Sequence, residues 1–468
     1  MTALTRGSVL VIGAGPSGLA AAAALSSLGV EFDLVDAQNH VGGVWNVANE
    51  DAPTWPSMKL ATSKSHTQFE DLRMPVGFPS FPSTDEYATY LRAYASHHGL
   101  TEHFEPNKAV RSARSFGEGQ WEVDFSSGEV RPYAGIIAAH GVSQRPFLPP
   151  LWHEARESGV RTIHSKNYLG AEETSEKNVL VIGGNQEAAD IAVELAKANR
   201  RVALHPTEAH WVVPRTWGPF AGDSLARLEP TFLGRTFNDT VAEKLLERGI
   251  GRPENVGLPK PEVSVMEDEP IVSDSLLKLV NERRIEVLQD GAHLPLTRFD
   301  LIVFATGYEP GVDYLEPAYT SDLFLGAFPR SRRDLAVLGQ VRVLGGVTPI
   351  LTQQADIAAY AMKELLDELE SGSASPALAR FEKLKSRADA DVRRTAPKQS
   401  GAGIRGAVSG VASRVRTAMR SSRIAEDSPW AAQNALDLLP EDQPIRLPLT
   451  DRERLLARLT TARAIFEK

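Results

Sequence analysis

Two segments of this chain join an apolar strand to a glycine-rich turn and a helix, the pattern typical of a dinucleotide-binding fold. In the first, Val9 to Ile12 leads into Gly13-Ala14-Gly15-Pro16-Ser17-Gly18, a complete G-x-G-x-x-G. In the second, Val179 to Ile182 leads into Gly183-Gly184-Asn185-Gln186-Glu187-Ala188, with Asn185 at the middle glycine position. Such turns let the backbone approach a pyrophosphate at a helix N-terminus. Two of them in one chain predict two dinucleotides and a redox enzyme.

The composition excludes several other classes of protein. At 468 residues the chain suits two or three domains, and a net charge of −9 disfavours nucleic acid as a partner. No apolar run approaches the roughly 20 residues that span a bilayer. The first residues lead directly into a strand, which predicts no signal peptide and a cytoplasmic location. With 0 Cys, the chain has no redox-active disulfide and no Cys-based zinc site, and no metal site is expected.

Outside the two fingerprints, the pattern of apolar residues predicts further elements. Residues 84–98 have helical spacing, residues 121–125 alternate as a strand, and residues 335–344 are expected to form one strand followed by a helix over 352–369. From 371 to 425 there are 12 Lys or Arg against 3 Asp or Glu. We expect this segment to be a solvated or partly disordered extension, with contact to an anionic surface as the alternative.

Several separate motifs resemble those of the group B flavoprotein monooxygenases, and most closely the flavin-containing monooxygenases. Besides the first fingerprint they are Gly42-Gly43-Val44-Trp45, Thr62-Ser63-Lys64, Trp211 to Arg215 and Ala305-Thr306-Gly307-Tyr308. The resemblance extends to about Met362. It implies two Rossmann-like domains in an α/β fold, with the NAD(P) domain inserted in the FAD domain and a helical or irregular C-terminal extension.

The resemblance also divides the chain and assigns its activity. The expected parts are 1–168 and 299–370 for FAD, 169–298 for NAD(P), and 371–468 for the extension. The implied reaction consumes NADPH and O2 and transfers one oxygen atom to a small apolar substrate through a C4a-(hydro)peroxyflavin. N- or S-oxygenation is preferred over Baeyer–Villiger insertion, whose local Arg-containing signature is not visible. The oligomeric state stays open, a homodimer included.

The resemblance assigns the following candidate site residues. The FAD site is expected to comprise Gly13, Gly15, Pro16, Ser17, Gly18, Asp36, Gly43, Val44, Trp45, Thr62, Val110, Ala139 and Gln353. The NAD(P) site is expected to comprise Gly183, Asn185, Gln186, Glu187, His205, Arg215, Thr306, Gly307 and Tyr308. Ser63 and His66 are the candidate catalytic side chains, although neither is assigned as a general acid.

The chain departs from the family pattern in two motifs. In F-x-G-x-x-x-H-x-x-x-Y/F, His164 and Tyr168 are present but Ser158 and Val160 replace Phe and Gly, which leaves a domain-interface role and a purely structural role open. Ala61 stands where many family members have an Asn before T-S-K. Since Ala61 has no polar group, an NAD(P)H oxidase or reductase is the alternative reaction class. A nucleotide-binding sensor is the non-enzymatic alternative.

The second fingerprint leaves the coenzyme open as well. Asn185 holds the backbone away from the pyrophosphate unless it adopts a positive φ. His205 would tolerate a 2′-phosphate, whereas Glu208 would repel one if it points inward. Arg201 and Arg215 could compensate through bidentate contacts. We expect NADPH, with NADH as the alternative.

Overall fold

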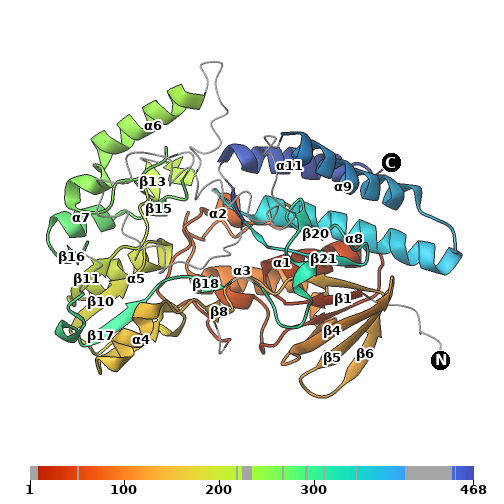
Figure 1. The fold of residues 1–468 in the computed structure, drawn as a ribbon, viewed down its shortest axis with the longest axis horizontal. Coiled ribbons are helices and arrows are strands. Elements are labelled where there is room, and N and C mark those ends of the chain that lie inside the picture. Colours follow the sequence, from red (N-terminus) through yellow and green to blue (C-terminus); the bar gives the residue numbers. More distant parts are fainter. Residues whose placement is uncertain are drawn as a thin grey trace, which may run out of the picture.

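The elements of the protein form two α/β lobes that lie side by side (Figure 1). The computed structural model describes residues 9–49, 52–217, 220–223, 235–265, 268–289, 294–309, 311–343, 345–395, 445–447 and 449–467. The first lobe contains the first fingerprint and the helices of the C-terminal part. The second lobe contains the second fingerprint. This arrangement confirms the predicted fold class of two Rossmann-like domains, one inserted in the other.

The first lobe is built on a parallel sheet of five strands. In the order β21-β7-β1-β2-β3 these are Leu335–Val337, Gly135–Ala138, Val9–Ile12, Phe32–Val35 and Phe104–Glu105. Every residue of β1 is buried because both faces of the sheet are covered. Val9 and Val11 pack against helices, whereas Leu10 and Ile12 pack against a second sheet.

That second sheet is antiparallel and covers one face of the first. Its strands are β4 (Val110–Gly117), β5 (Gln120–Phe125) and β6 (Val130–Tyr133). Trp121, Val123 and Phe125 are buried against the parallel sheet, which confirms the alternation predicted for this strand.

Helices cover the other face of the parallel sheet. They are α1 (Pro16–Ser27), α3 (Thr84–His97) and α8 (Thr348–Ser371), while the short α2 (Lys64–Thr67) lies against α8. A capping box begins α3, because the Ser83 hydroxyl accepts from the Glu86 N–H while the Glu86 carboxylate accepts from the Ser83 N–H. The single strand expected over 335–344 is instead two strands, β21 and β22 (Val341–Val343), because the chain turns at Gly339 with φ +79°.

The second lobe repeats the plan with a sheet in the order β16-β11-β10-β17-β9. These strands are Ile285–Val287, Arg201–His205, Asn178–Ile182, Leu301–Phe304 and Arg161–His164. Its helices are α4 (Pro150–Glu157), α5 (Gln186–Lys197), α6 (Arg235–Gly249) and α7 (Leu276–Asn281). Strands β9 and β17 belong to this sheet, although the predicted boundaries assign residues 161–164 and 301–304 to the FAD domain. Strand β9 (Arg-Thr-Ile-His) and strand β17 (Leu-Ile-Val-Phe) are each only four residues long, so the sequence alone does not indicate which sheet they join.

Four short two-stranded sheets lie outside the main sheets of the two lobes. They are β8 (Arg145–Pro146) with β18 (Tyr308–Glu309), β12 (Val212–Val213) with β15 (Ile271–Val272), β13 (Thr216–Trp217) with β14 (Phe220–Ala221), and β19 (Leu323–Phe324) with β20 (Phe328–Pro329). The first of these pairs is antiparallel. The outgoing and returning connections between the lobes therefore run beside each other as a ribbon.

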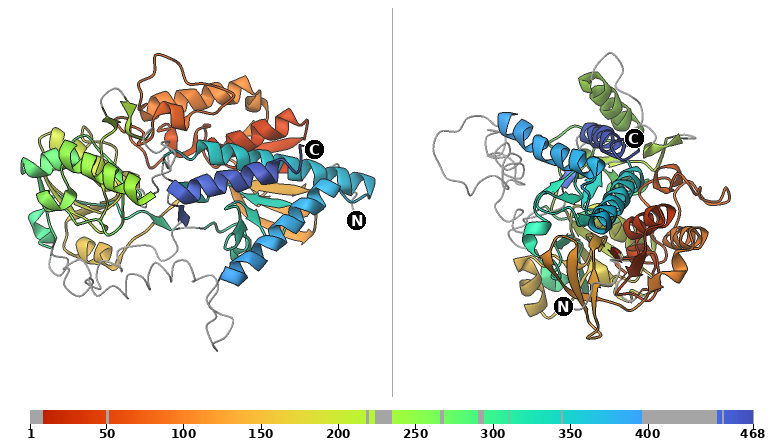
Figure 2. Two further views of the ribbon diagram at one scale, coloured as in Figure 1. Left: turned by 90° about the horizontal axis from the view of Figure 1, so that it is seen from above. Right: turned by 90° about the vertical axis from the view of Figure 1, so that its right-hand side faces the viewer.

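The C-terminal part returns to the first lobe. Helices α9 (Pro376–Thr395) and α11 (Leu449–Arg463) pack on α8 (Figure 2), and β23 (Ile445–Leu447) pairs with β22. Leu455, Leu459 and Ala462 join the core of this lobe. The basic segment predicted over 371–425 lies outside the described residues beyond Thr395. None of the described helices is long and apolar enough to cross a membrane.

Candidate active site

The first glycine turn has no space for side chains at its two outer glycines. A Cβ on Gly13, whose φ is +103°, would lie 2.4 Å from the carbonyl oxygen of Ala139. A Cβ on Gly18 would lie 1.7 Å from the carbonyl oxygen of Gly13. Within the described residues, no side chain caps the N-terminus of α1, where Pro16 occupies the first turn. The first N–H groups of α1 are therefore available to an anion such as a pyrophosphate.

Asp36 lies beside this turn at the end of β2. Its Oδ2 accepts a hydrogen bond of 2.6 Å from the Ala14 N–H, and its Oδ1 accepts one of 2.8 Å from the Gln38 N–H. Burial raises the pKa of the carboxyl group, although these backbone hydrogen bonds act in the opposite direction. A carboxylate fixed here fits the role of ribose ligand that the sequence predicts.

The G-G-x-W segment packs directly on the glycine turn. The Gly42 N–H donates to the Ala14 carbonyl oxygen at 2.9 Å, and a Cβ on Gly43 would lie 3.0 Å from the Cα of Gly15. Residues Gly43–Trp45 form a 3₁₀ turn whose Trp45 ring meets Tyr87 edge-on at 5.4 Å. Val44 accepts at its carbonyl from Thr54. The predicted residues of both motifs thus form one cradle.

Four other residues predicted to bind FAD lie outside the G-G-x-W segment, each on a different element. Ala139 follows β7 and contacts the first glycine, Ser17 lies on α1, Val110 begins β4, and Gln353 lies on α8. The Oε1 of Gln353 accepts from the Thr460 hydroxyl of α11 at 3.1 Å. Its role toward FAD stays a prediction.

The candidate catalytic residues are buried beside the second lobe. Ser63 and His66 are each 2% exposed, and the Ser63 Oγ lies 2.9 Å from the His66 Nδ1. Asp223, from the second lobe, accepts from the Ser63 N–H at 2.6 Å and lies 3.4 Å from the His66 Nδ1. The Thr62 hydroxyl does not join this group and forms a hydrogen bond of 2.7 Å with the Thr67 hydroxyl. The structure therefore joins Ser63, His66 and Asp223 in one cluster across the lobe boundary.

Two neighbours fix the position of this cluster. Lys64 donates from Nζ to the carbonyl oxygens of Val76 at 3.2 Å and Phe78 at 2.8 Å, so it holds the Pro-rich loop. The Thr348 hydroxyl, in the first turn of α8, donates to the Thr67 carbonyl oxygen at 2.9 Å. The N-terminus of a 24-residue helix thus lies next to the candidate catalytic residues, where its dipole favours negative charge.

In the second glycine turn the first glycine again lies close to a backbone carbonyl, but here a side chain caps the helix that follows. A Cβ on Gly183 would lie 2.2 Å from the Ala305 carbonyl oxygen. Asn185 has φ −92°, not the positive φ that would relieve its side chain. Its Oδ1 accepts from the Ala188 N–H at 3.0 Å and its Nδ2 donates to the Ala305 carbonyl oxygen at 3.0 Å. Asn185 is therefore the N-cap of α5.

Gln186 and Glu187 make structural contacts. Gln186 exchanges hydrogen bonds with the backbone of Val272, which fixes β15 against α5. The Glu187 carboxylate accepts from the Ser165 hydroxyl at 2.7 Å. Binding of NAD(P) by either side chain stays a prediction.

Of the basic residues expected near the coenzyme phosphate, His205 and Arg215 have partners within the protein, and Arg201 lies at the far end of its strand. His205 is 5% exposed, its Nδ1 bonds to the Leu288 carbonyl oxygen at 2.8 Å, and burial lowers its pKa. Arg201 lies at the amino end of β11, about 13 Å from His205 along the strand. The Arg215 guanidinium lies 3.4 Å from the carboxylate of Asp190 on α5. Arg201 therefore cannot compensate for Glu208 as the sequence suggested, and Arg215 already has an acidic partner.

The A-T-G-Y segment and the His164–Tyr168 motif lie where the lobes meet. The Thr306 hydroxyl donates to the Phe147 carbonyl oxygen, and the His164 Nε2 lies 3.1 Å from the Gly307 carbonyl oxygen. Tyr308 meets the His164 ring edge-on at 5.2 Å, and Tyr168 meets Trp55 of the first lobe at 5.1 Å. Burial lowers the pKa of His164 to about 4, so the ring is neutral at pH 7. The sequence leaves a domain-interface role and a purely structural role open for the His164–Tyr168 motif, and these contacts favour the domain-interface role.

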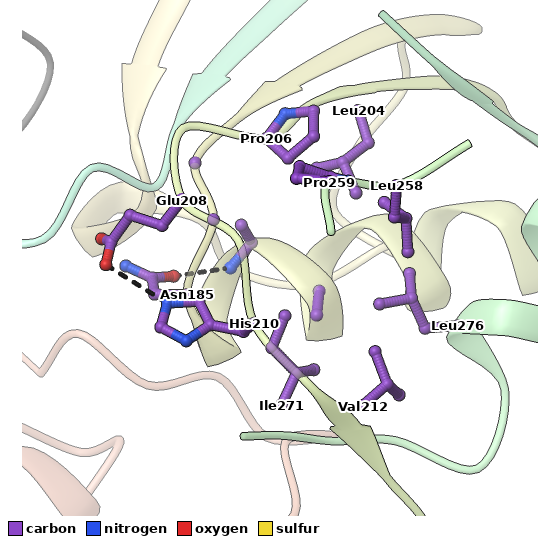
Figure 3. A pocket seen from close by; sticks show the side chains of 14 residues that line it. Asn185, Leu204, Pro206, Glu208, His210, Val212, Leu258, Pro259, Ile271 and Leu276 are labelled. Atoms are coloured by element: carbon purple, nitrogen blue, oxygen red, sulfur yellow. Dashed lines mark hydrogen bonds and ion pairs between the residues drawn. The ribbon is translucent and has the colours of Figure 1, made fainter. Parts of the chain in front are cut away.

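A recess lies between the second glycine turn and the loop that follows β11 (Figure 3). Its polar walls are Asn185, Glu208 and His210, and its other side chains are apolar.

Two residues near the sites were not predicted from the sequence, Asp223 and Gly339. A Cβ added to Gly339 would lie 2.7 Å from the Ser17 Oγ. Neither belongs to a motif, so only the folded chain reveals them. Among the described residues, no cluster of His, Asp or Glu side chains is arranged to hold a metal ion.

Two dinucleotide cradles on facing lobes define a two-nucleotide oxidoreductase. Residues 6–374 match the family described as Flavin-binding monooxygenase-like. The chain belongs to this family and is a flavin-dependent monooxygenase that uses FAD, NADPH and O2. The uncapped α1 and the glycine surfaces that face it fit the FAD pyrophosphate.

Individual relatives are distant. The chain is 28% identical to rabbit (Oryctolagus cuniculus) dimethylaniline monooxygenase [N-oxide-forming] 2, over 76% of this chain and 73% of that protein. It is 26% identical to the probable indole-3-pyruvate monooxygenase YUCCA1 of Arabidopsis thaliana, over 65% and 76%. The closed structure of cyclohexanone monooxygenase superposes with a TM-score of 0.61 at 17% identity, over 98% of this chain and 97% of that one. S-allyl-L-cysteine S-oxygenase from Allium sativum gives 0.51 at 14% identity, over 98% and 99%.

Proposed function

We propose that this enzyme transfers one oxygen atom of O2 to a nitrogen or sulfur atom of a small, mostly apolar substrate. One NADPH and one proton are consumed, and the second oxygen atom leaves as water. Membership of the flavin-binding monooxygenase-like family supports this reaction, together with a relative named as N-oxide-forming. The observation that carries the proposal is the Ser63–His66–Asp223 cluster, which joins the two nucleotide lobes at the T-S-K segment.

Groups of the first lobe bind and orient FAD. The N-terminus of α1 and the backbone of Gly13, Gly15 and Gly43 hold the FAD pyrophosphate, and Asp36 accepts from its ribose. When bound, FAD supplies the oxidation–reduction and oxygen chemistry.

The cluster at the lobe boundary holds a proton and limits solvent. Asp223 fixes the Ser63 backbone, so the Ser63 Oγ and the His66 Nδ1 share one hydrogen-bonded proton in a buried position. The packing of Trp55 against Tyr168 keeps water out of the lobe boundary. Ala61 adds no polar group, so these residues supply the polar contacts of this segment.

Product analysis tests the proposal. Purified holoenzyme is incubated with NADPH and a panel of tertiary amines, sulfides and cyclic ketones, and products and hydrogen peroxide are measured against NADPH consumed. We expect an N-oxide or S-oxide close to one per NADPH. An ester or lactone from the ketones would favour the Baeyer–Villiger alternative. Hydrogen peroxide as the sole product with every substrate would favour the oxidase alternative.

Location and assembly are also proposals. We propose a cytoplasmic location and a solvated extension over 371–425, with contact of this basic segment with an anionic surface as the alternative, and the oligomeric state stays open, a homodimer included. Cell fractionation, light scattering and vesicle sedimentation of the full chain test these three statements separately.

A further inference from the structure

The last strand and helix of the chain repeat the arrangement of the strand and helix beside them. Strand β23 pairs in parallel with β22, and α11, which follows β23, packs on α8, which follows β22 (Figure 2). Thr460 of α11 contacts Gln353 in the second turn of α8. Three residues further along both helices, Arg463 contacts Asp356, so the helices also run in the same direction. We call β23 and α11 the C-terminal unit, and it lies beyond the family match, which ends at residue 374.

Strand β22 lies between two close approaches, one to each part of the candidate site. Gly339 precedes the strand with φ +79°, and its Cβ would lie 2.7 Å from the Ser17 Oγ of α1. Gly346 follows the strand with φ +92°, and its Cβ would lie 2.5 Å from the His66 carbonyl oxygen. Whatever holds β22 therefore also sets the distance of its ends from the FAD turn and from His66.

The C-terminal unit supports this part of the chain from two sides. Among the described strands, β22 pairs with β23 alone, so β23 supplies the strand's sheet hydrogen bonds. On the helix side, Leu459 and Ala462 of α11 are 0% exposed and belong to the core that contains α8. Both β22 and the first turns of α8 thus have the C-terminal unit as a neighbour.

Polar and aromatic contacts anchor α11 along α8. They are Thr460 with Gln353 at 3.1 Å, Arg463 with Asp356 at 2.7 Å, and Phe466 stacked on Tyr360 with ring centroids 5.9 Å apart. Gln353 is the residue of α8 that the sequence assigns to FAD. The Thr460 hydroxyl lies 3.0 Å from the Leu456 carbonyl oxygen as well, which fixes the hydroxyl within its own helix. The orientation of the Gln353 amide is therefore set from α11.

We propose that the C-terminal unit holds β22 and the first turns of α8 against the FAD site, with Thr460 as a positioning residue that acts on FAD through Gln353. Loosening the unit admits water, so NADPH, H⁺ and O2 give NADP⁺ and H2O2 in place of oxygenated product. This inference rests on the proposed function, because it takes the Ser63–His66–Asp223 cluster as the place of oxygen transfer.

Retention of FAD tests the inference apart from the reaction. Purified holoenzyme at pH 7 is diluted, and the FAD dissociation rate is followed by the recovery of flavin fluorescence. We compare wild type with T460V, R463Q and the conservative T460S. The controls are T461V, an exposed threonine that bonds within α11, and R111Q, an exposed arginine of β4.

Two further measurements use the same samples. Hydrogen exchange is followed in β22 and in the first turns of α8, and urea unfolding reports the global stability. Hydrogen peroxide per NADPH consumed is measured with a tertiary amine and a sulfide.

We expect T460V and R463Q each to release FAD about fivefold faster than wild type, as loss of one hydrogen bond of ordinary strength predicts. Exchange in β22 and the first turns of α8 should accelerate, and the share of NADPH that yields hydrogen peroxide should rise. T460S should behave as wild type because it keeps the hydroxyl, and T461V and R111Q should stay within about twofold.

Three outcomes would overturn the inference. One is FAD release at the wild-type rate in folded T460V and R463Q. Another is equal acceleration in T460V and T461V, which would trace the effect to helix stability alone. The third is exchange of β22 amides in wild type as fast as in an unfolded peptide, and this result decides the matter even if a variant fails to fold. Hydrogen peroxide as the sole product in every sample would refute the proposed function, while the FAD release rates and the exchange would still judge the C-terminal unit.

Discussion

The two glycine turns of this enzyme have the same backbone plan but complete their helices differently. In both, the first glycine meets the carbonyl of an alanine that follows a neighbouring strand, Ala139 in one lobe and Ala305 in the other. In the first lobe α1 has no side-chain cap within the described residues, whereas Asn185 caps α5. A helix that lacks a cap depends on its ligand for hydrogen-bond partners, and a helix that is already capped does not. The difference suits a resident cofactor in the first lobe and an exchanging coenzyme in the second.

The third glycine position gives the largest expected difference between the lobes. We expect Gly18→Ala to abolish FAD retention, because its Cβ would lie 1.7 Å from a backbone oxygen. At the equivalent position the native Ala188 is already accommodated, so Ala188→Gly should lower the free energy of unfolding by only about 1 kcal/mol. Flavin content per chain and urea unfolding measure the two effects. Normal flavin content in Gly18→Ala would contradict the account of the first turn.

Asp36 provides the next largest effect. Asp36→Asn removes the charge that accepts from the Ala14 and Gln38 N–H groups and from the ribose, so we expect the Kd for FAD to rise by about tenfold to a hundredfold. Apoprotein reconstitution followed by flavin fluorescence measures this Kd. The matched change in the second lobe, His205→Asn, should leave FAD binding unaltered. An unchanged Kd in Asp36→Asn would show that this acid is not a ribose ligand.

Two partly buried histidines should give the lobes opposite pH dependence. Since the pKa of His210 is raised to about 9, its contribution to stability is fully present below about pH 6.5 and is lost as the pH rises through 9. Burial lowers the pKa of His140 in the first lobe to about 4, so its contribution is lost as the pH falls from 6.5 to 4.

Urea unfolding of wild type and His210→Gln between pH 6.5 and 9.5 tests the first of these histidines. The wild-type free energy of unfolding should fall by about 2 kcal/mol relative to the variant across this range. Parallel profiles for the two proteins would mean that His210 is not charged in the folded state.

The cap of α5 provides the smallest effect and the sharpest comparison of the helices. Asn185→Gly frees the Ala188 N–H and restores the middle glycine of the fingerprint, so we expect NADP⁺ to bind several-fold more tightly, or by about 1 kcal/mol. FAD content should stay the same. Calorimetric titration of holoenzyme measures the change, and weaker binding would indicate that Asn185 itself contacts the coenzyme.

The sequence predicted the parts of the site that depend on local backbone geometry. Both glycine turns, Asp36 and the G-G-x-W contact follow from short motifs, because each motif forms its turn from neighbouring residues. Asp223 could not be predicted, since its contact with Ser63 joins two lobes and its own segment has no periodicity. Glu208 was recognised as a possible source of repulsion, but its partner His210 and the distance of Arg201 from the site are properties of the folded lobe. The predicted boundaries assign β9 and β17 to the FAD domain for the same reason, because the sequence of a four-residue strand does not encode which sheet it joins.

One chain thus holds FAD in one lobe and receives a reducing coenzyme in the other. Anaerobic titration of purified holoenzyme with NADPH, followed by the flavin absorbance, tests it most directly. We predict one FAD per chain and full bleaching by about one equivalent of NADPH, because the two-electron reduction is stoichiometric. A colourless chain that FAD cannot reconstitute, or a bound flavin that neither NADPH nor NADH reduces, would contradict the claim.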